Sequence, residues 1–290
     1  MGKRHLVGKA AAASVALGTL ACALVAPRRG VEAIDAQWEE FSRFRYAHRG
    51  LHDNRGPAPE NSLAAFRLAR EGGYGSELDV HLTADGHLVV IHDSNPWRVC
   101  GVEGIVERMT LEELSHLRLF ASSERIPTFE QVLECYEQGE GPCPPLVVEV
   151  KTHQSNYAEL TAATMALLDA HAVPYCVESF DPRVVWWLRN NRPEVMRGQL
   201  AENFFRDEAS TLDVAKKAAF GALAFNVLTR PDFVAYKHAD RRHPSVRLAC
   251  GVLGGKLVTW TVRSASELAE VEAAGGVGIF EGFEPGPLKG

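Results

Sequence analysis

Short apolar runs of strand length alternate with amphipathic stretches of helix length from residue 46 onward, and this alternation limits the fold more than any other feature. Several of the runs are apolar almost throughout, which is typical of parallel strands covered by helices. The pattern predicts an α/β fold, and the length of the segment suits one closed (β/α)8 barrel. Strands are expected at residues 45–48, 77–81, 88–92, 146–151, 175–180, 197–200, 222–226, 257–262 and 277–281.

These nine candidates exceed the eight places of such a barrel, so one of them is wrong or lies outside it. Only residues 82–87 separate the second candidate from the third. That is too short for a helix, so two parallel strands here would need an extended return. Residues 94–125 then form a stretch that looks like an insertion. Helix starts carry N-cap residues or capping boxes, at Asn61 or Ser62, at Thr110 with Glu113, at Thr128 with Gln131, at Asp181 before Pro182, and at Ser264 with Glu267.

The N-terminal segment is hydrophobic: the seventeen residues 10–26 carry no charge and lie between Lys9 and Arg28. As a helix they would span about 25 Å, slightly less than the ~30 Å hydrocarbon core of a bilayer. Two interpretations stay open, an uncleaved single-pass membrane anchor and a signal peptide cleaved near residues 21–23 to give a secreted protein. The anchor is favoured because the apolar run continues past that small-residue site. The basic start resembles an export signal, so the main domain is expected outside the cytoplasm.

The chain therefore divides into a signal anchor or signal peptide (residues 1–29), a connector helix (30–44) and one barrel domain (45–290). In the connector, Ile34, Trp38 and Phe41 recur at helical spacing, which indicates a helix packed on the outside of the domain.

Charge and cysteine usage exclude some classes of function. The net charge is -6 and no basic stripe is present, so nucleic acid has no electrostatic support as a partner. A small phosphate ester needs only one or two well-placed cations. The six cysteines form no CxxC pair, and no His/Cys spacing resembles a zinc site.

Three carboxylates lie at alternate positions of predicted strands. Glu77 and Asp79 are two residues apart and so point to the same side of a strand, as do Glu149 and Lys151. Charged residues inside apolar strands cost several kcal/mol unless they bind something. A divalent cation would relieve the repulsion among the three acids, and hard oxygen ligands suit Ca²⁺ or Mg²⁺.

Two histidines lie at strand ends beside this cluster. His48 and His92 have the near-neutral pKa range that a base and an acid require. Arg49 and Lys151 add fixed positive charge suited to a phosphate. In a barrel, active sites form at the C-terminal ends of the strands. The set therefore predicts metal-assisted cleavage of an anionic ester, most naturally phosphoryl transfer.

Six motifs occur in a fixed order: His48-Arg49-Gly50, Pro59-Glu60-Asn61, Glu77-x-Asp79, Thr83-x-Asp85-Gly86, His92-Asp93 and Glu149-x-Lys151. The set resembles the glycerophosphodiester phosphodiesterase family, over residues 46 to about 287. This resemblance implies a TIM-type barrel of the PLC-like phosphodiesterase type, here with an N-terminal hydrophobic helix. It also implies hydrolysis of glycerophosphodiesters to an alcohol and glycerol 3-phosphate.

The resemblance also implies roles for particular residues. One divalent cation, Ca²⁺ or Mg²⁺, would be held by Glu77, Asp79 and Glu149. The acid–base pair would be His48, which deprotonates the nucleophile, and His92, which protonates the leaving alkoxide. The substrate-binding residues would be Arg49 and Lys151 on the phosphate, Glu60 on the metal or a glycerol hydroxyl, and Trp260, which walls the pocket or belongs to the barrel core.

Residues 279–285 depart from the Asp-containing motif with which many members of the family end. Here the chain resembles a membrane-linked bacterial branch. Two other functions remain open: phospholipase-type or lysophospholipase D activity on lipid phosphodiesters such as lysolipids, and an inactive, membrane-tethered binding barrel. The expected partners are thus a glycerophosphodiester or lysolipid substrate and a membrane that the N-terminal segment contacts.

Overall fold

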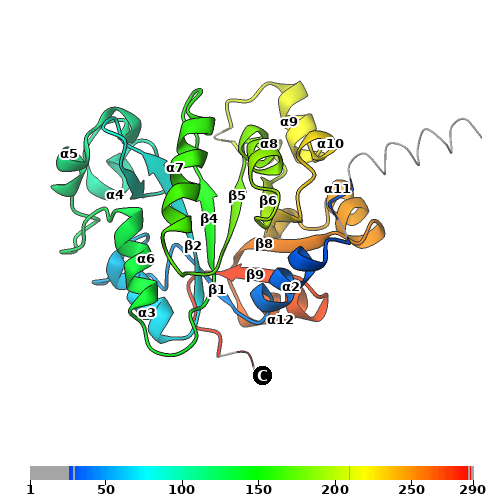
Figure 1. Cartoon of the computed structure of the whole chain (residues 1–290), viewed down its shortest axis with the longest axis horizontal. Coiled ribbons are helices and arrows are strands. Elements are labelled where there is room, and N and C mark those ends of the chain that lie inside the picture. The colour runs from blue at the N-terminus through cyan, green and yellow to red at the C-terminus, as the bar shows by residue number, and fades with distance from the viewer. Residues whose placement is uncertain (1–25, 29, 209, 287, 289–290) are drawn as a thin grey trace, which may run out of the picture.

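The computed structural model describes residues 26–28, 30–208, 210–286 and 288. In this part of the chain, eight parallel strands close into a barrel, which confirms the predicted fold class (Figure 1). Each strand pairs with its neighbour in parallel, and pairing of the first barrel strand with the second closes the ring. The barrel strands are β1 (Tyr46–His48), β2 (Gly75–Leu82), β4 (Leu146–Val150), β5 (Tyr175–Ser179), β6 (Arg197–Ala201), β7 (Phe233–Lys237), β8 (Lys256–Val262) and β9 (Val277–Phe280).

The short strand β3 (Leu88–Val90) lies outside the barrel. It pairs antiparallel with β2, with Val90 opposite Val80. The turn between the two strands includes Gly86 at a φ of 83°, a conformation that glycine adopts without steric cost. No helical crossover is needed, because an antiparallel pair can be joined by a tight turn.

The predicted strand at residues 222–226 is wrong. This stretch joins two helices, and Leu223 packs against Val234 and Tyr236 of β7. The strand that belongs in the barrel is β7 itself, which follows Asp232. A run of four or five apolar residues has no periodicity that separates a buried turn from a buried strand.

Helices surround the strands, and the predicted N-caps are present. Ser62, Asp181 and Ser264 each accept a backbone N–H of the first turn, and capping boxes form at Thr110 and Thr128. The capping box predicted for Ser264 with Glu267 forms only in part, because Glu267 Oε2 accepts the backbone N–H of Arg263 at 3.0 Å. The helices are α2 (Glu32–Phe41), α3 (Leu63–Glu71), α4 (Trp97–Cys100), α5 (Leu111–Ser115), α6 (Phe129–Glu137), α7 (Tyr157–Asp169), α8 (Pro182–Asn191), α9 (Val214–Gly221), α10 (Asn226–Thr229), α11 (Pro244–Val246) and α12 (Ala265–Ala273). The 3-10 turns are η1 (Val106–Arg108) and η2 (His238–Asp240), and η3 (Arg247–Val252) is a π-helical segment.

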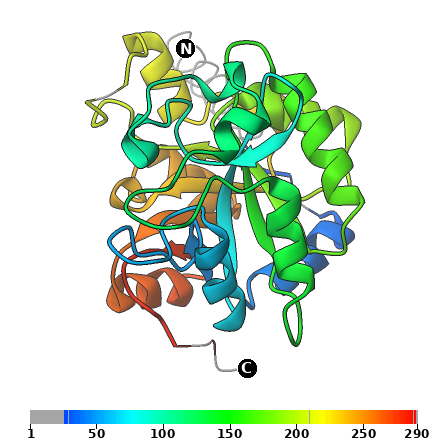
Figure 2. The same ribbon diagram turned by 90° about the vertical axis from the view of Figure 1, so that its left-hand side faces the viewer.

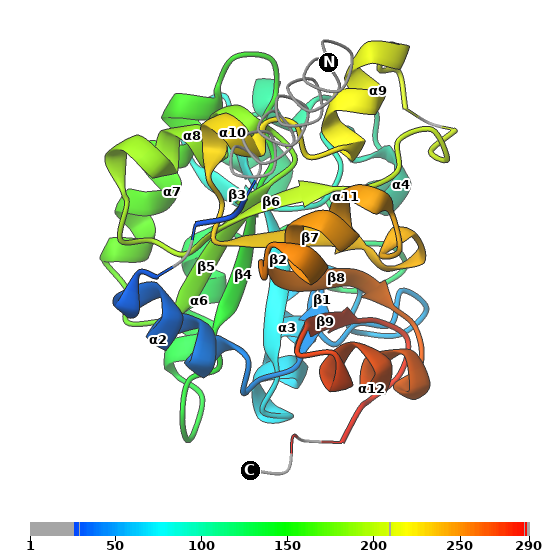
Figure 3. The ribbon, with the colours of Figure 1, turned by 90° about the vertical axis from the view of Figure 1, so that its right-hand side faces the viewer.

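Helix α2 closes one end of the barrel (Figure 3). Its buried Ile34 and Phe41 pack against Tyr46 and Phe233, the first residues of β1 and β7. The Phe41 and Tyr46 rings stack with centroids 4.3 Å apart. The helix therefore packs across the N-terminal ends of the strands, and the C-terminal ends remain for a site.

Residues 94–125, predicted as an insertion, have a small core of their own. Val99 of α4, Val106 of η1 and Leu114 of α5 are buried together with Val89 and Ile91, beside the end of β2. Figure 2 shows this stretch gathered at the upper end of the molecule.

The predicted hydrophobic helix over residues 10–26 lies outside the described residues, apart from Ala26. Within the described residues, no helix has both the length and the apolar character that a bilayer crossing requires.

Candidate active site

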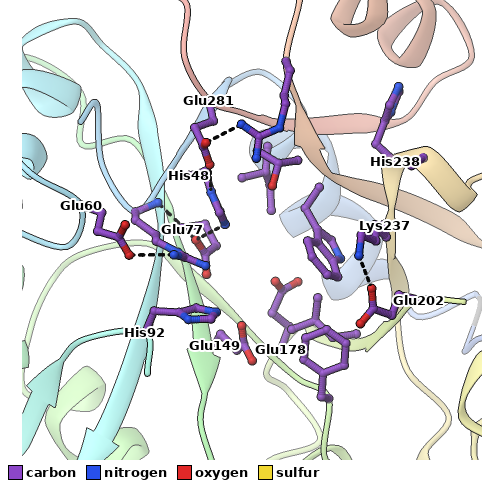
Figure 4. A pocket seen from close by; sticks show the side chains of 18 of the residues that line it. His48, Glu60, Glu77, His92, Glu149, Glu178, Glu202, Lys237, His238 and Glu281 are labelled. Carbon is purple, nitrogen blue, oxygen red and sulfur yellow. Dashed lines mark hydrogen bonds and ion pairs between the residues drawn. The ribbon is translucent and has the colours of Figure 1, made fainter. Parts of the chain in front are cut away.

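A cavity of about 780 Å³ opens at the C-terminal ends of the barrel strands. Figure 4 shows His48 and Glu77 on one side of this cavity and Lys237 and Glu202 on the other, with Glu149 towards the middle. The predicted site residues that line it are His48, Arg49, Glu60, Glu77, His92, Glu149, Lys151 and Trp260; Asp79, the remaining one, is buried beneath them.

The three predicted metal ligands converge. Asp79 of β2 lies opposite Glu149 of β4 in the sheet register, and Glu77 is two residues away on the same face. One carboxylate oxygen from each residue lies within 4.8 Å of the other two, and all three residues are buried. Burial and the neighbouring carboxylates raise the pKa of Glu77 well above its usual value. Burial would raise the pKa of Asp79 too, but the charges of His92, Lys151 and Arg49 outweigh it and hold that pKa low.

This cluster fits a divalent cation. Asp79 Oδ1 is buried and accepts no hydrogen bond among the described atoms, although the Lys151 ammonium lies 3.4 Å away, so this oxygen can still coordinate a metal ion. Three hard oxygen donors form a suitable ligand set. A bound cation would also remove the repulsion that disfavours the charged form of Glu77.

Two positively charged side chains, Lys151 and Arg49, lie beside the three carboxylates. Lys151 Nζ lies 3.1 Å from Glu149 Oε1 and 3.4 Å from Asp79 Oδ1. The Arg49 Nε atom is 3.5 Å from Asp79 Oδ2, and the Arg49 backbone N–H donates to Glu77 Oε2 at 3.2 Å. The Arg49 backbone has a φ of 55°, a strained conformation for a residue with a side chain. The local fold thus holds positive charge against buried acids.

Glu60 is neutralised by guanidinium groups. Arg49 Nη1 donates to Glu60 Oε1 at 2.7 Å, and Arg98 donates to both carboxylate oxygens at 2.7 and 2.9 Å. Burial alone would raise the pKa of Glu60, but Arg98 and Arg49 hold it at about 2. Glu60 lines the cavity but stands apart from the three-carboxylate group. Its clearest effect is to hold Arg49 in place.

His48 is held by a carboxylate. His48 Nδ1 lies 2.5 Å from Glu281 Oε2, and Arg263 Nη1 donates to Glu281 Oε1 at 2.6 Å. Burial lowers the pKa of His48 to about 4, and the pKa of Glu281 is held at about 2 by His48 and Arg263 against the effect of burial. Because Glu281 is ionised, Nδ1 carries the imidazole proton. The lone pair is then on Nε2, which lies 3.8 Å from Glu77 Oε2.

His92 has a similar partner. His92 Nδ1 lies 2.6 Å from Asp93 Oδ1, and Arg98 Nε donates to Asp93 Oδ2 at 2.5 Å. Burial lowers the pKa of His92, although the charge of Asp79 acts in the opposite direction. Both predicted histidines therefore line the cavity, and the Nδ1 atom of each contacts a carboxylate oxygen.

Trp260 lies between the cavity and the barrel core. It lines the cavity beside Lys237, its partner in the β7–β8 register, and it packs against the barrel core. Its ring contacts Phe180 edge to face with centroids 5.6 Å apart. Lys237 Nζ pairs with Glu202 Oε2 at 2.5 Å on this side of the cavity.

Sequence reasoning missed several residues of the site. Glu281 follows the last strand directly, so its strand-end position was a usable signal. Glu178 of β5 lies opposite Glu149 in register and is buried with one oxygen unpartnered among the described atoms, so strand alternation could have found it. Asn61, whose Nδ2 donates to Asp79 at 2.9 Å, belongs to a noted motif. Arg98, in the insertion, carried no signal.

The closed barrel of eight parallel strands, with a cavity at the C-terminal ends of those strands, places this chain in the class of (β/α)8-barrel enzymes. Residues 48–282 match the model of the "Glycerophosphoryl diester phosphodiesterase family". The chain belongs to this family.

Two curated relatives carry related names. A Bacillus subtilis (strain 168) protein named "Putative glycerophosphodiester phosphodiesterase YhdW" is 32% identical over an alignment of 248 residues that covers 82% of this chain and 93% of that protein. A "Glycerophosphodiester phosphodiesterase" of Caldanaerobacter subterraneus subsp. tengcongensis is 50% identical over 96 residues, covering 30% of this chain and 38% of that protein.

Solved structures share the fold. An Oleispira antarctica phosphodiesterase, solved in complex with the product sn-glycerol-3-phosphate, matches with a TM-score of 0.63 at 24% identity, over 82% of this chain and 92% of that one. A Silicibacter pomeroyi DSS-3 structure of the same family name has a TM-score of 0.66 at 22% identity, over 85% and 93% of the two chains.

Proposed function

We propose that this chain hydrolyses glycerophosphodiesters to an alcohol and glycerol 3-phosphate. The observation that carries the proposal is the convergence of Glu77, Asp79 and Glu149 within 4.8 Å, beside two histidines that each contact a carboxylate. Membership of the family supports the choice of a glycerophosphodiester as the substrate.

The three carboxylates would hold one divalent cation, Ca²⁺ or Mg²⁺. When bound, it supplies Lewis-acid polarisation of a phosphoryl oxygen and stabilises developing negative charge. The ligand set contains only oxygen atoms, which favours these hard cations over zinc.

The side chains around the cation would divide the remaining tasks. His48 accepts a proton from the nucleophile at Nε2, while Glu281 keeps the proton of the ring on Nδ1 and stabilises the imidazolium that forms. His92 donates a proton to the leaving alkoxide, and the negative phosphate of the substrate favours its protonated form. Arg49 and Lys151 bind the phosphate. To do so, their side chains would leave the carboxylates that they now contact and would donate hydrogen bonds to phosphate oxygens of the substrate.

Release of glycerol 3-phosphate tests this function. The purified chain is given glycerophosphocholine or glycerophosphoglycerol with Ca²⁺, with Mg²⁺ or with a chelator. We expect turnover with a metal and loss of turnover with the chelator. His48→Gln and His92→Gln should each lower kcat about 10²- to 10⁴-fold, the usual range for a general acid or base.

His87→Gln is the matched control, because the His87 side chain is 53% exposed and pairs only with Asp85 at 3.4 Å in the described structure. Its activity should equal that of the wild type. No turnover of any glycerophosphodiester would refute the proposal, and a stable cyclic phosphate product would indicate a lyase instead.

We further propose that residues 10–26 attach the chain to a membrane as a single-pass anchor, with the barrel outside the cytoplasm. The support is the uncharged run of seventeen residues and its basic flanks.

A further inference from the structure

His52 is a buried histidine that the proposed reaction does not use. Its side chain is 10% exposed, and both ring nitrogens are buried without a hydrogen-bond partner among the described atoms. Buried polar atoms are nearly always paired, so two unpaired nitrogens on one ring need an explanation. The neighbouring backbone is held in place, since Leu51 N–H donates to Ala65 O and Asp53 N–H donates to Ala58 O.

His52 lies beside two other side chains that can bind a metal ion, His48 and Glu281. His52 Nε2 lies 4.0 Å from Glu281 Oε2, and His48 Nδ1 lies 2.5 Å from the same oxygen. One ligand atom from each of the three residues lies within 4.8 Å of the other two. This group is distinct from the acidic cluster: it uses the Nδ1 side of the His48 ring, whereas Nε2 is the atom near Glu77.

We propose that His48, His52 and Glu281 form an inhibitory site for a borderline transition-metal ion, with Zn²⁺ as the natural occupant. Two imidazoles and one carboxylate are a known zinc ligand set, with a fourth position left for water. Imidazole nitrogen selects zinc over Ca²⁺ and Mg²⁺, so the proposed catalytic cation would not compete well here. Tetrahedral bonds of about 2.0–2.1 Å put ligand atoms roughly 3.3 Å apart. The observed distances of 2.5 Å and 4.0 Å from Glu281 Oε2 lie on either side of this spacing.

Zinc would inhibit the enzyme because it changes which nitrogen of His48 carries the proton. This part of the inference rests on the proposed function, in which His48 is the base. Zinc forms coordinate bonds with His48 Nδ1, His52 and Glu281, and the proton that Nδ1 shared with Glu281 is released to solvent. A neutral imidazole with metal on Nδ1 carries its proton on Nε2. The lone pair that should accept a proton from the nucleophile is then lost, and Glu281 no longer orients the ring.

Zinc titration of the enzyme is the first test. Glycerol 3-phosphate release is measured with saturating Ca²⁺ and increasing ZnCl₂ for the wild type, His52→Gln and His87→Gln. We expect inhibition of the wild type and of H87Q. H52Q should need at least about 10-fold more zinc for half-inhibition, since even residues that only support a metal ligand change affinity by 10- to 100-fold. Equal sensitivity of H52Q and wild type would overturn the site.

Direct binding is the second test and does not depend on activity. Zinc is titrated by calorimetry into Glu77→Gln, which weakens the acidic cluster by removing one of its three ligands, and into the same variant carrying H52Q or H87Q. Circular dichroism shows whether each variant is folded. One equivalent should bind to E77Q and to E77Q/H87Q, and the H52Q change should abolish it.

The two proposals fail separately. A chain that binds one zinc through His52 but turns over no phosphodiester would refute the proposed function and keep the metal site. An active, folded chain without His52-dependent zinc binding would refute the metal site alone.

Discussion

His48 depends on a carboxylate that lies 233 residues further along the chain. The contact between His48 Nδ1 and Glu281 decides which nitrogen of the ring is free to accept a proton. Glu281 is itself held by Arg263 from the end of β8. Three strand ends therefore cooperate to position one imidazole, and Glu281 is a positioning residue.

Glu281→Gln should lower kcat about 100-fold with little change in KM, because the neutral amide no longer stabilises the imidazolium. Steady-state kinetics on glycerophosphocholine would measure this split. Glu281→Asp should recover part of the lost rate, since it restores the charge at a longer distance. An unchanged kcat in E281Q, or a loss seen only in KM, would exclude the positioning role.

We expect the Glu77→Gln substitution to stabilise the metal-free protein and to reduce the stabilisation that Ca²⁺ gives. In the metal-free protein, burial and Asp79 disfavour the charged form of Glu77, so Glu77→Gln should raise the melting temperature. With Ca²⁺, the wild type should gain stability and E77Q should gain less, because one ligand is missing. Thermal melts in chelator and in excess Ca²⁺ would measure both shifts. A larger Ca²⁺ shift in E77Q would contradict the assignment.

At the scale of elements, helix α4 connects the insertion to the site. Arg98 donates to both oxygens of Glu60 and to Asp93, the partner of His92. The helix has only four residues, so its position depends on these ion pairs and on the small core around Val99. The insertion is thereby coupled both to Arg49, through Glu60, and to His92.

Arg98→Ala should lower kcat/KM about 10-fold and the free energy of unfolding by about 1–2 kcal/mol. The stability effect is set below that of a fully buried pair, because the Arg98 side chain is 43% exposed. Arg98→Lys should recover little, since an ammonium cannot form the bidentate contact. The exposed Arg108→Ala is the control, assayed by urea unfolding and by kinetics. Equal behaviour of R98A and R108A would show that α4 does not act on the site.

At the scale of the whole molecule, an ion pair fixes the start of the described chain to the barrel domain. Arg28 donates to both oxygens of the buried Asp232 at 2.6 and 2.9 Å, ahead of α2. Helix α2 then covers the N-terminal end of the barrel, opposite the cavity. The eight barrel strands and the residues that line the cavity all lie within the described part of the chain, after Arg28.

A chain that starts at residue 26 should keep its kcat and its melting temperature within about 2 °C, because it retains Arg28 and α2. It should leave the membrane fraction, to which the full chain is expected to bind. Cell fractionation with an activity assay on each fraction would measure this. A truncated chain that still sediments with membranes would place the membrane contact elsewhere.

Local chemistry in the sequence determined the strand and helix pattern and most of the site. A strand has a period of two, so Glu77 and Asp79 had to share one face wherever the strand lay. Capping residues bond to their own helix, so Thr110 and Thr128 marked helix starts before any packing was known. These features depend on neighbours a few residues apart.

Only the tertiary structure decided the contacts that barrel closure creates. In the structure, β3 lies outside the barrel, and β7 occupies the place expected for a strand at 222–226. Glu281 contacts His48, and Arg98 contacts Glu60. Such pairs depend on which strand ends become neighbours when the ring closes, and no local periodicity records that choice. The same closure placed His52 beside Glu281, a juxtaposition that spacing along the chain could not predict.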